Sequence, residues 1–430
     1  MSAEQVRPGY QLTEVGVIPE DWEVRPLGKI GTFSKGQGIK REDVSDEGLP
    51  CIRYGEIYTT YDHYVHEPVT RIPADTASRS RPIQFGDILF TGSGETADEI
   101  GKCVAYLGND IAYAGGDIII LTPSGCDPMF LGYILNFSTV SQQKSNLGQG
   151  DIIVHIATRN LAKVLVPLPP LPEQRAIAAA LGDVDALLAG LERLIARRRA
   201  VKQAAMDALL SGRVRLPGFG QGTGRRQSEV GVIPGDWEVR RLEEIAHIDP
   251  EFLGPDTSPD YEFRYISIEN VDKGSLTGYS EQIFRTAPSR ARKRVKLGDV
   301  LFCTVRPNLQ SHLLFVNGSD DWVCSTGFCV LRAKTSLSLS TFLFFQAFST
   351  AIIRQVDALI AGSNYPAISN KDVRCLLVPL PSLAEQRAIA AVLSDMDAAI
   401  AALERQCDKV QALKQAMMAE LLTGRVRLVR

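Results

Sequence analysis

The strongest constraint on this fold is that the chain of 430 residues contains the same sequence pattern twice. Each copy opens with Val-Gly-Val-Ile-Pro-x-Asp-Trp, at 15–22 and 230–237, and closes with Glu-Gln-Arg-Ala-Ile-Ala, at 173–178 and 385–390. A chain of this length is also too long for one hydrophobic core. The repeat therefore predicts two modules of the same fold.

Each closing motif starts a long segment in which apolar residues recur at spacings of three and four, ending at Gly212 or Gly424. A 3.5-residue period kept over several heptads is typical of a coiled-coil seam. The predicted seam residues are Ile177, Val184, Leu187, Leu191, Leu194 and Val201 in the first copy, and Ile389, Met396, Leu403, Val410 and Leu413 in the second. The stripe is widened by Leu181, Leu188, Ile195 and Leu209, and by Leu393, Ile400 and Leu421. Each helix is the expected partner of the other.

Between each opening motif and its closing motif, short strands are broken by Gly, Pro, Asn and Asp, without a βαβ rhythm. We predict an α+β protein with two similar mixed α/β domains, mostly antiparallel in their sheets. They are separated by two long helices packed as an antiparallel coiled coil, with pseudo-twofold symmetry. The predicted segments are a first domain at 1–164, a first helix at 165–216, a glycine-rich flexible linker at 217–228, a second domain at 229–376 and a second helix at 377–430.

Composition excludes several classes of protein. No apolar run approaches the eighteen or so residues that a membrane span needs, and no signal-peptide pattern opens the chain, so a cytoplasmic location is expected. The eight cysteines form no Cys-x-x-Cys pair, which argues against a disulfide framework or a zinc site. A net charge of −3 decides nothing about a polyanionic partner.

A search for catalytic motifs finds none. The chain has no GxxxxGK[ST] phosphate loop, no Asn-Pro-Pro or Asp-Pro-Pro stretch for base methylation, and no carboxylate two residues before a lysine, as metal nucleases use. We therefore expect a non-catalytic protein without a metal site.

Basic and polar residues gather instead in loops that differ between the two copies. The loop 91–96 shares almost nothing with 303–308, and 147–151 almost nothing with 359–365. Arginine and lysine suit phosphate contacts, while Arg, Asn, Gln and Tyr suit base edges. A solvated charged face is the alternative interpretation. The candidate DNA contacts are Lys35, Lys40, Arg41, Arg53, Tyr54, Arg79, Arg81, Ser93, Thr96, Gln149, Arg285, Arg290, Arg292, Lys293, Arg294, Thr304, Arg306, Asn308, Ser363, Asn364 and Tyr365.

The two opening motifs and the two closing motifs, together with Arg306-Pro307-Asn308, resemble the specificity subunit of type I restriction–modification systems over nearly the whole chain. The resemblance implies two target-recognition domains, each reading one half of a bipartite site in double-stranded DNA. It also implies two modification subunits, which carry the adenine methyltransferase chemistry, and restriction subunits as partners. S-adenosylmethionine, ATP and Mg would be bound by those partners, and this chain would need no cofactor.

A competing interpretation is a non-enzymatic adaptor in which a coiled coil spaces two protein- or glycan-binding modules. Such an adaptor would show weak salt dependence and no preference for duplex DNA. A self-sufficient methyltransferase is disfavoured because its motifs are missing. The sequence leaves the two half-sites and their spacing open.

Overall fold

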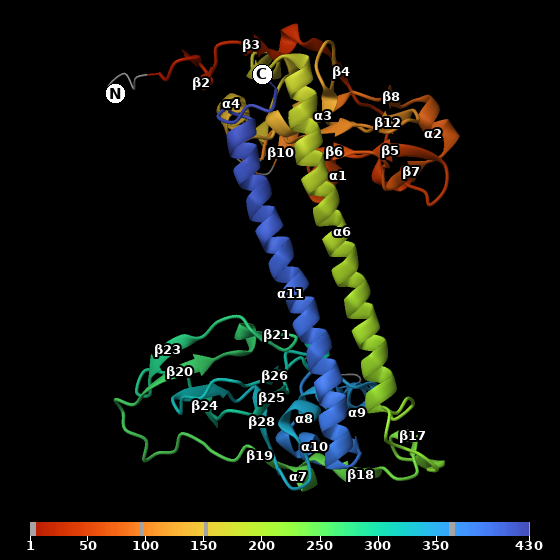
Figure 1. Ribbon diagram of the computed structural model, residues 1–430, viewed down its shortest axis with the longest axis vertical. Coiled ribbons are helices and arrows are strands. Elements are labelled where there is room, and N and C mark those ends of the chain that lie inside the picture. Colours follow the sequence, from red (N-terminus) through yellow and green to blue (C-terminus); the bar gives the residue numbers. More distant parts are fainter. Residues whose placement is uncertain (1–5, 95, 97–98, 150–153, 361–365, 430) are drawn as a thin grey trace. The chain divides into compact units, whose positions relative to one another are not determined.

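The computed structural model describes residues 6–94, 96, 99–149, 154–360 and 366–429. The chain divides into two compact units (Figure 1). Unit 1 combines 1–192 with 406–430, and unit 2 is the continuous stretch 193–405. Each unit therefore contains one module and a part of both long helices, so the units do not follow the five segments predicted from the sequence.

The module of unit 1 contains two main sheets. A five-stranded sheet has the order β4-β13-β9-β11-β6 and a four-stranded sheet the order β7-β5-β12-β8, with pairs β1-β2, β15-β3 and β10-β14. Most pairings are antiparallel, and β11-β6 and β12-β5 are parallel. The elements are β1 Tyr10–Thr13, β2 Gly16–Pro19, β3 Glu23–Pro26, η1 Leu27–Lys29, β4 Gly31–Lys35, η2 Arg41–Asp43, β5 Leu49–Ile52, α1 Tyr54–Thr59, β6 Tyr64–Val65, β7 Thr70–Ile72, α2 Ala74–Ser78, β8 Arg81–Ile83, β9 Ile88–Thr91, β10 Ser93–Gly94, β11 Cys103–Tyr106, β12 Ala112–Ala114, β13 Ile118–Pro123, α3 Pro128–Ile134, α4 Ser138–Leu147, β14 Val154–His155, α5 Thr158–Leu161 and β15 Leu165–Leu168.

The module of unit 2 repeats this order, with sheets β19-β28-β25-β26 and β23-β20-β27-β24 and pairs β16-β17, β18-β29 and β21-β22. The predicted internal repeat and mixed α/β fold are confirmed. The elements are β16 Arg225–Ser228, β17 Gly231–Pro234, β18 Glu238–Arg241, α7 Leu242–Ile245, β19 Ala246–Ile248, β20 Glu262–Ile266, η3 Ile268–Asn270, β21 Val271–Asp272, β22 Ser275–Leu276, β23 Ser280–Ile283, β24 Ala291–Val295, β25 Val300–Cys303, η4 Pro307–Leu309, β26 Leu313–Leu314, β27 Trp322–Ser325, β28 Phe328–Ala333, α8 Ser340–Ala347, α9 Thr350–Ile360, α10 Asn370–Cys375 and β29 Leu377–Leu380. The end of the predicted linker, 225–228, is thus strand β16.

The long helices are α6, Leu171–Leu210, and α11, Leu383–Leu421. Within unit 2 they are antiparallel, because Arg199 pairs with Glu404 while Lys202, further along α6, pairs with the earlier Asp397. Gly212 and Gly424 follow the helix ends with φ of 66° and 68°, as expected for C-terminal glycine caps. The predicted antiparallel helix pair is therefore confirmed within this unit.

The buried stripe of these helices differs from the predicted seam. Leu187, Leu194, Val201 and Leu413 are exposed by 48, 38, 47 and 54%. Ile177, Leu191 and Ile389 of the predicted seam are buried, and so are Leu181, Leu188, Ile195, Leu393 and Ile400, which were predicted to widen the stripe. The stripe has two parallel columns of apolar residues, and near the helix ends both pack into the module cores, Ile177 and Ile389 from the predicted seam and Leu181 and Leu393 from the second column.

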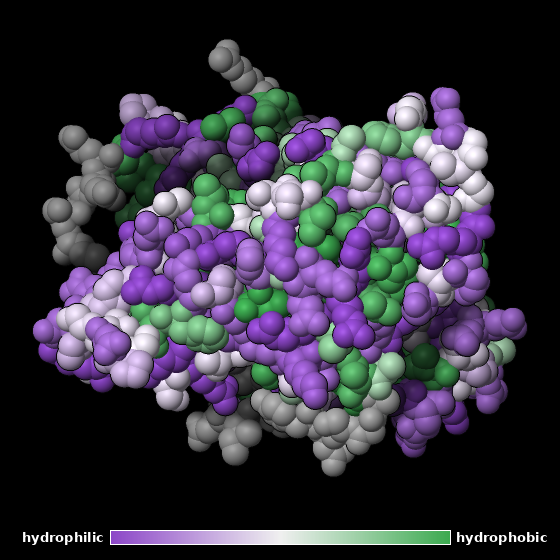
Figure 2. All heavy atoms as spheres, turned by 90° about the horizontal axis from the view of Figure 1, so that it is seen from below, coloured by the Kyte–Doolittle hydropathy of each residue, from purple (hydrophilic) through white to green (hydrophobic). Residues whose placement is uncertain are grey.

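Two large cores organise the units. In unit 1, Ile177 and Leu181 of α6 and Met418 of α11 join the module core, and in unit 2 Met206 of α6 and Leu393 of α11 do so. Hydrophilic residues cover most of the face in Figure 2, and hydrophobic residues form separate patches on it. Among the described residues, no single helix is both long and apolar enough to cross a membrane, although α8 and α9 pass such a test together despite a 53° bend between them.

Candidate nucleic-acid interface

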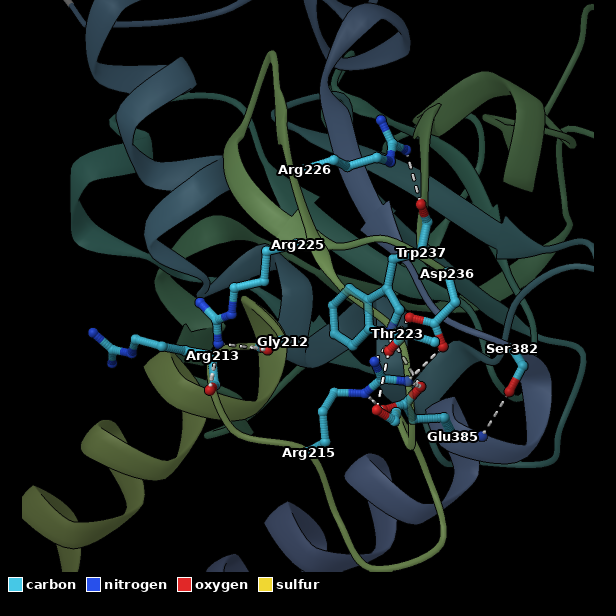
Figure 3. A network of polar contacts seen from close by, with 11 residues as sticks. Gly212, Arg213, Arg215, Thr223, Arg225, Arg226, Asp236, Trp237, Ser382 and Glu385 are labelled. Atoms are coloured by element: carbon cyan, nitrogen blue, oxygen red, sulfur yellow. Dashed lines mark hydrogen bonds and ion pairs between the residues drawn. The ribbon is translucent and has the colours of Figure 1, made fainter.

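The repeated motifs meet in one polar cluster, shown for unit 2 in Figure 3. Glu385, at the start of α11, is 2% exposed at its side chain and accepts hydrogen bonds from the Trp237 indole at 3.1 Å and from the Arg215 guanidinium. Arg215 also forms two bonds of 2.9 Å to Asp236, holding the pKa of that carboxyl below its usual range. The strand pairing β18-β29 brings the motifs together, because β18 follows Trp237 and β29 precedes α11.

The same cluster closes unit 1. Arg427 bonds to the buried Glu173 at 2.6 and 2.7 Å and to Asp21 at 2.9 and 2.6 Å, and the Trp22 indole donates to Glu173 at 3.1 Å. The residues that the two copies share are thus bonded to one another within each unit. The most strongly repeated motifs therefore stabilise each unit internally.

An equivalent backbone bond in each unit joins the first of the differing loops, 91–96 or 303–308, to a neighbouring turn. In unit 1 the Gly92 N–H donates to the Asp117 carbonyl at 2.8 Å, and in unit 2 the Thr304 N–H donates to the Gly327 carbonyl at 2.9 Å. One loop follows β9 or β25, and the other is the turn before β13 or β28. The scaffold therefore presents a differing loop beside a turn at the same position of the fold in both units.

In unit 1 this region includes a cavity of about 520 Å³. Four sequence-predicted residues line it, namely Lys40, Arg41, Arg53 and Tyr54, and Asp117 completes its rim with a left-handed φ of 61°. Such a conformation is uncommon for a residue other than glycine and frequently marks a functional site. Cations, an aromatic ring and a carboxylate thus surround one concave surface.

Helix α1 fixes the orientation of these side chains. Glu56, 5% exposed, accepts from the Arg53 Nε at 2.8 Å and from its backbone N–H at 3.1 Å. Tyr58 reaches the neighbouring loop, where its hydroxyl oxygen lies 2.8 Å from both Thr91 Oγ1 and the Ser93 carbonyl oxygen. Burial raises the pKa of Tyr58 to about 12, so its hydroxyl stays protonated.

Three more predicted residues lie in or beside the end of this loop. Ser93 Oγ is 2.9 Å from His155 Nδ1, and Gln149 exchanges backbone hydrogen bonds with His155. Thr96 is exposed and bonds to Glu99. His155 and Asp117 were missed from the sequence. The turn 115–117, polar and between two apolar strands, was the available signal for Asp117.

In unit 2 the corresponding loop follows β25. Arg306 and Gln310 both have left-handed backbones, with φ of 51° and 55°, on either side of the short η4 helix. Such residues cost about 1–3 kcal/mol each and are retained where the surrounding structure requires the geometry. Arg306 and Asn308 are exposed, so the strained loop presents an arginine and an asparagine outward. Arg290, also exposed, lies beside the turn before β28, because its carbonyl accepts from the Thr326 N–H at 2.8 Å.

Two predicted contacts of unit 2 are contradicted by their burial. Lys293 is 2% exposed, and its ammonium donates to Asp249 at 2.8 Å and to the Phe328 carbonyl at 2.5 Å. Because side chains along β24 alternate between the two faces of the sheet, Lys293 points inward with Ala291 and Val295. Thr304 is 4% exposed and donates its hydroxyl to the Gly327 carbonyl, so it positions the loop and does not face solvent.

The remaining candidates fall into two groups. Some have acidic or aromatic partners: Arg79 pairs with Asp43, Arg285 with Asp260, Arg292 lies 5.0 Å from the Phe284 ring centre and Arg294 5.0 Å from that of Tyr261. Lys35 and Arg81 are exposed, with no ion pair among the described residues. Ser363, Asn364 and Tyr365 lie outside the described residues, and DNA contact by all of these residues stays a prediction.

Metal ligation has no support in the part of the chain that is described, where no group of three or more His, Cys, Asp or Glu side chains could hold an ion. His312 is also unsuited to titrate near neutral pH. It is buried, accepts the Cys303 N–H through Nδ1 at 3.0 Å and stacks on Phe302, and its burial lowers its pKa to about 3. It supports the β25–η4 loop from inside.

Comparison with known proteins gives a consistent family. The type I restriction modification DNA specificity domain matches twice, at residues 19–197 and 234–412. The putative MjaX specificity subunit of Methanocaldococcus jannaschii is 27% identical over 97% of this chain and 96% of its own length. The EcoKI specificity subunit of Escherichia coli K12 is 24% identical over 95% of this chain and 90% of its own length.

Solved structures share the fold. The type I restriction–modification S subunit from M. genitalium aligns over 93% of this chain and 96% of its own, with a TM-score of 0.56 at 16% identity. A chain from a study of complex assembly and conformational transition of the type I R-M system aligns over 95% and 99%, with a TM-score of 0.55 at 20% identity. With both modules matched by the same domain, this chain belongs to the family of type I restriction–modification specificity subunits, which are not themselves the catalytic chains.

Proposed function

We propose that each unit reads one half of a bipartite site in double-stranded DNA, and that the chain directs modification and restriction subunits to that site. Unit 1 would use the surface around Lys40, Arg41, Arg53 and Tyr54, and unit 2 the loop carrying Arg306 and Asn308. Arginine is the usual bidentate partner of guanine and asparagine of adenine in the major groove. The exposed cations supply phosphate contacts.

The observation that carries this proposal is the equivalent backbone bond, Gly92 to Asp117 in unit 1 and Thr304 to Gly327 in unit 2. It joins a loop to a neighbouring turn in a framework that is repeated, while the side chains of the loop are unrelated. Two copies of one scaffold with different polar residues at the same place favour two readers of different sequences. The adaptor alternative gives no reason for arginines at that place in both units.

Partner binding is supported by the exposed apolar residues of the long helices. Val201 in unit 2 and Leu413 in unit 1 occupy equivalent positions of the repeat, and they are 47 and 54% exposed. Exposed apolar side chains at heptad spacing are suited to a further helix. One such position in each unit fits two modification subunits. Methyl transfer, with S-adenosylmethionine, and cleavage, with ATP and Mg, would then occur in partner subunits.

The experiment is the methylome of cells carrying the complete system with single substitutions. Asn308→Ala is expected to relax the preferred base at one position of one half-site, with about 1–3 kcal/mol of discrimination lost. Arg53→Ala should change the other half-site only. Leu309→Ala, at an exposed neighbour of Asn308, is the matched control and should leave both half-sites unchanged. Changes in both half-sites from either substitution, or in none, would contradict the assignment.

A further inference from the structure

The repeat places the same ion pair beside the same aromatic position in both units. In unit 1, Lys414 of α11 is 2.6 Å from Asp185 of α6, and its ammonium lies 5.8 Å from the ring centre of Tyr133. In unit 2 the equivalent residues are Lys202 and Asp397, with Lys202 5.6 Å from the ring centre of Phe345. The two sites are equivalent in sequence, yet their surroundings differ.

In unit 1 the site is filled by the chain itself. The ring of His63 lies 4.7 Å from that of Tyr133, and Tyr64 lies 6.1 Å from it. The backbone before β6 can approach because position 132 is glycine, where a Cβ would lie 2.3 Å from the His63 carbonyl oxygen. Under this cover the side chains of Lys414 and Asp185 are only 4 and 17% exposed.

The filled site also shields the Nδ1 atom of His63 from water. Its burial lowers its pKa to about 4, and its Nδ1 has no hydrogen-bond partner among the described residues. The imidazole is therefore held neutral, as an aromatic ring in a closed pocket. The rings of His63 and Tyr64, at adjacent positions of the chain, thus fill the site beside Tyr133.

In unit 2 the equivalent site is open. Phe344 replaces the glycine, and the chain turns away as the β21–β22 hairpin, whose Gly274 lies against the Phe344 ring. A cavity of about 690 Å³ remains between this hairpin, α8 and the helix pair. The side chains of Lys202 and Asp397 are 22 and 42% exposed, against 4 and 17% for their counterparts.

We propose that this open cavity of unit 2 receives an aromatic side chain from a bound modification subunit, in the place that His63 and Tyr64 fill in unit 1. The partner rests on the proposed function, whereas the aromatic chemistry rests on the repeat. The cavity lies within the range of about 300–1,000 Å³ of ligand pockets. Buried aromatic anchors are frequent centres of protein interfaces.

A nucleic acid does not fit this cavity as well as a protein does. Its three cations, Arg199, Lys202 and Lys273, are matched by three carboxylates in the same lining, those of Glu404, Asp397 and Asp272, and the first two cations are directly paired. Little positive charge is therefore left for phosphate. Phe344, Phe345 and Phe348 line the cavity and provide a hydrophobic surface. The ammonium of Lys202 beside that surface favours a further aromatic ring through a cation–π contact.

The first experiment tests, without any partner protein, whether the open cavity of unit 2 binds aromatic rings. The full chain, with ¹³C-methyl methionine, is titrated with p-cresol and 4-methylimidazole, the side-chain analogues of Tyr and His. Met206 lines the open cavity, and its equivalent Met418 belongs to the same core cluster as Tyr133 of the filled site. Both are nearly buried, at 4 and 5% exposure, so the two methyl signals form an internal control. A saturable shift of Met206 alone is expected. No saturable shift of Met206, or equal shifts of both, overturns the proposal.

The second experiment tests the occupant with the purified modification subunit. Ala401 lines the cavity, and Ala401→Trp fills it from α11, whereas Ala398→Trp places the same ring at an exposed position of the same helix. Native mass spectrometry is expected to show one of two binding events weakened at least about tenfold by Ala401→Trp and neither by Ala398→Trp. Unchanged binding overturns the modification subunit as occupant. If wild-type chain binds no modification subunit, the proposed function fails while the methionine result stands.

Discussion

Replacing Arg215 with alanine tests the structural role of the repeated motifs. Arg215 is the only cation shown bonded to Glu385 among the described residues, and the Glu385 side chain is 2% exposed. The substitution leaves that carboxylate buried with one hydrogen bond, from the Trp237 indole at 3.1 Å. A buried charge that has lost its partner is costly because neither water nor another cation can replace it.

The expected loss follows from the burial of the two contacts. Removing one partner of a buried ion pair costs about 3–5 kcal/mol. The second pair, to Asp236, is 38% exposed at its carboxylate and adds less than about 1 kcal/mol. We therefore expect unit 2 to lose about 3–5 kcal/mol of its free energy of unfolding. Arg215→Lys should lower the free energy of unfolding by less than Arg215→Ala does, because the ammonium keeps the charge. It should still be less stable than the wild type, because a single ammonium cannot make the bidentate contacts of a guanidinium.

Fluorine NMR of protein containing 5-fluorotryptophan measures each unit separately during urea unfolding. The chain has three tryptophans, with Trp22 in unit 1 and Trp237 and Trp322 in unit 2. Arg215→Ala should move the transitions of Trp237 and Trp322 to lower urea. The equivalent Arg427→Ala should move that of Trp22. Separate signals matter because a chain with two units need not unfold in one step.

Two controls decide whether the unpaired charge of Glu385 causes the loss of stability. Arg240→Ala removes an exposed arginine of unit 2 and should leave the transition unchanged. Adding Glu385→Gln to Arg215→Ala removes the charge while keeping an acceptor for the Trp237 indole, and should recover part of the loss. A loss below about 1 kcal/mol in Arg215→Ala, or no recovery in the double variant, would refute this reasoning.

Three further outcomes are expected. His312 has a pKa of about 3 in the folded chain and about 6.5 when unfolded. The stability of unit 2 should therefore be complete above about pH 6.5 and fall by up to about 1.4 kcal/mol per pH unit as the pH drops toward about 3. Urea titrations of His312→Gln should show a flatter dependence on pH. Leu393→Asp should unfold or aggregate unit 2, whereas Leu187→Asp, at an exposed position, should change the melting temperature little; equal effects would contradict the buried stripe. Four residues inserted after both Glu192 and Arg405, where the units divide, should lengthen the gap between methylated half-sites by one or two base pairs, since a helical turn adds about 6 Å; an unchanged gap would exclude the helices as its determinant.

The repeat and its two long helices were predictable because they depend on local sequence pattern. Which side of each helix is buried was not predictable. Two apolar columns run along α6, and the sequence gives both similar weight. The column of Leu181 and Leu188 is buried, and the column of Leu187 and Leu194 is exposed. Which column packs inward depends on where the modules contact the helix, and that contact is tertiary.

The basic stretch near Arg306 illustrates the same limit at the candidate interface. Strand alternation could have separated Arg292 and Arg294 from Lys293, since neighbouring residues point to opposite faces. The partner of Lys293 could not be found this way, because Asp249 is distant in sequence. The strained backbone at Arg306 and Gln310 also has no sequence signal, because both residue types normally avoid that conformation.

The pairing of Arg427 with Glu173 and Asp21 sets an order for folding during synthesis. Unit 2 is continuous, so all its parts have been translated once residue 405 is made. Unit 1 must wait for residues 406–430, and at about 5–20 residues per second the ribosome needs roughly 20–80 s to go from Trp22 to Arg427. During that interval Trp22 and Glu173 lack the arginine that neutralises their site. The module translated first is thus completed last, and the nascent chain exposes its unfinished core to chaperones and proteases throughout.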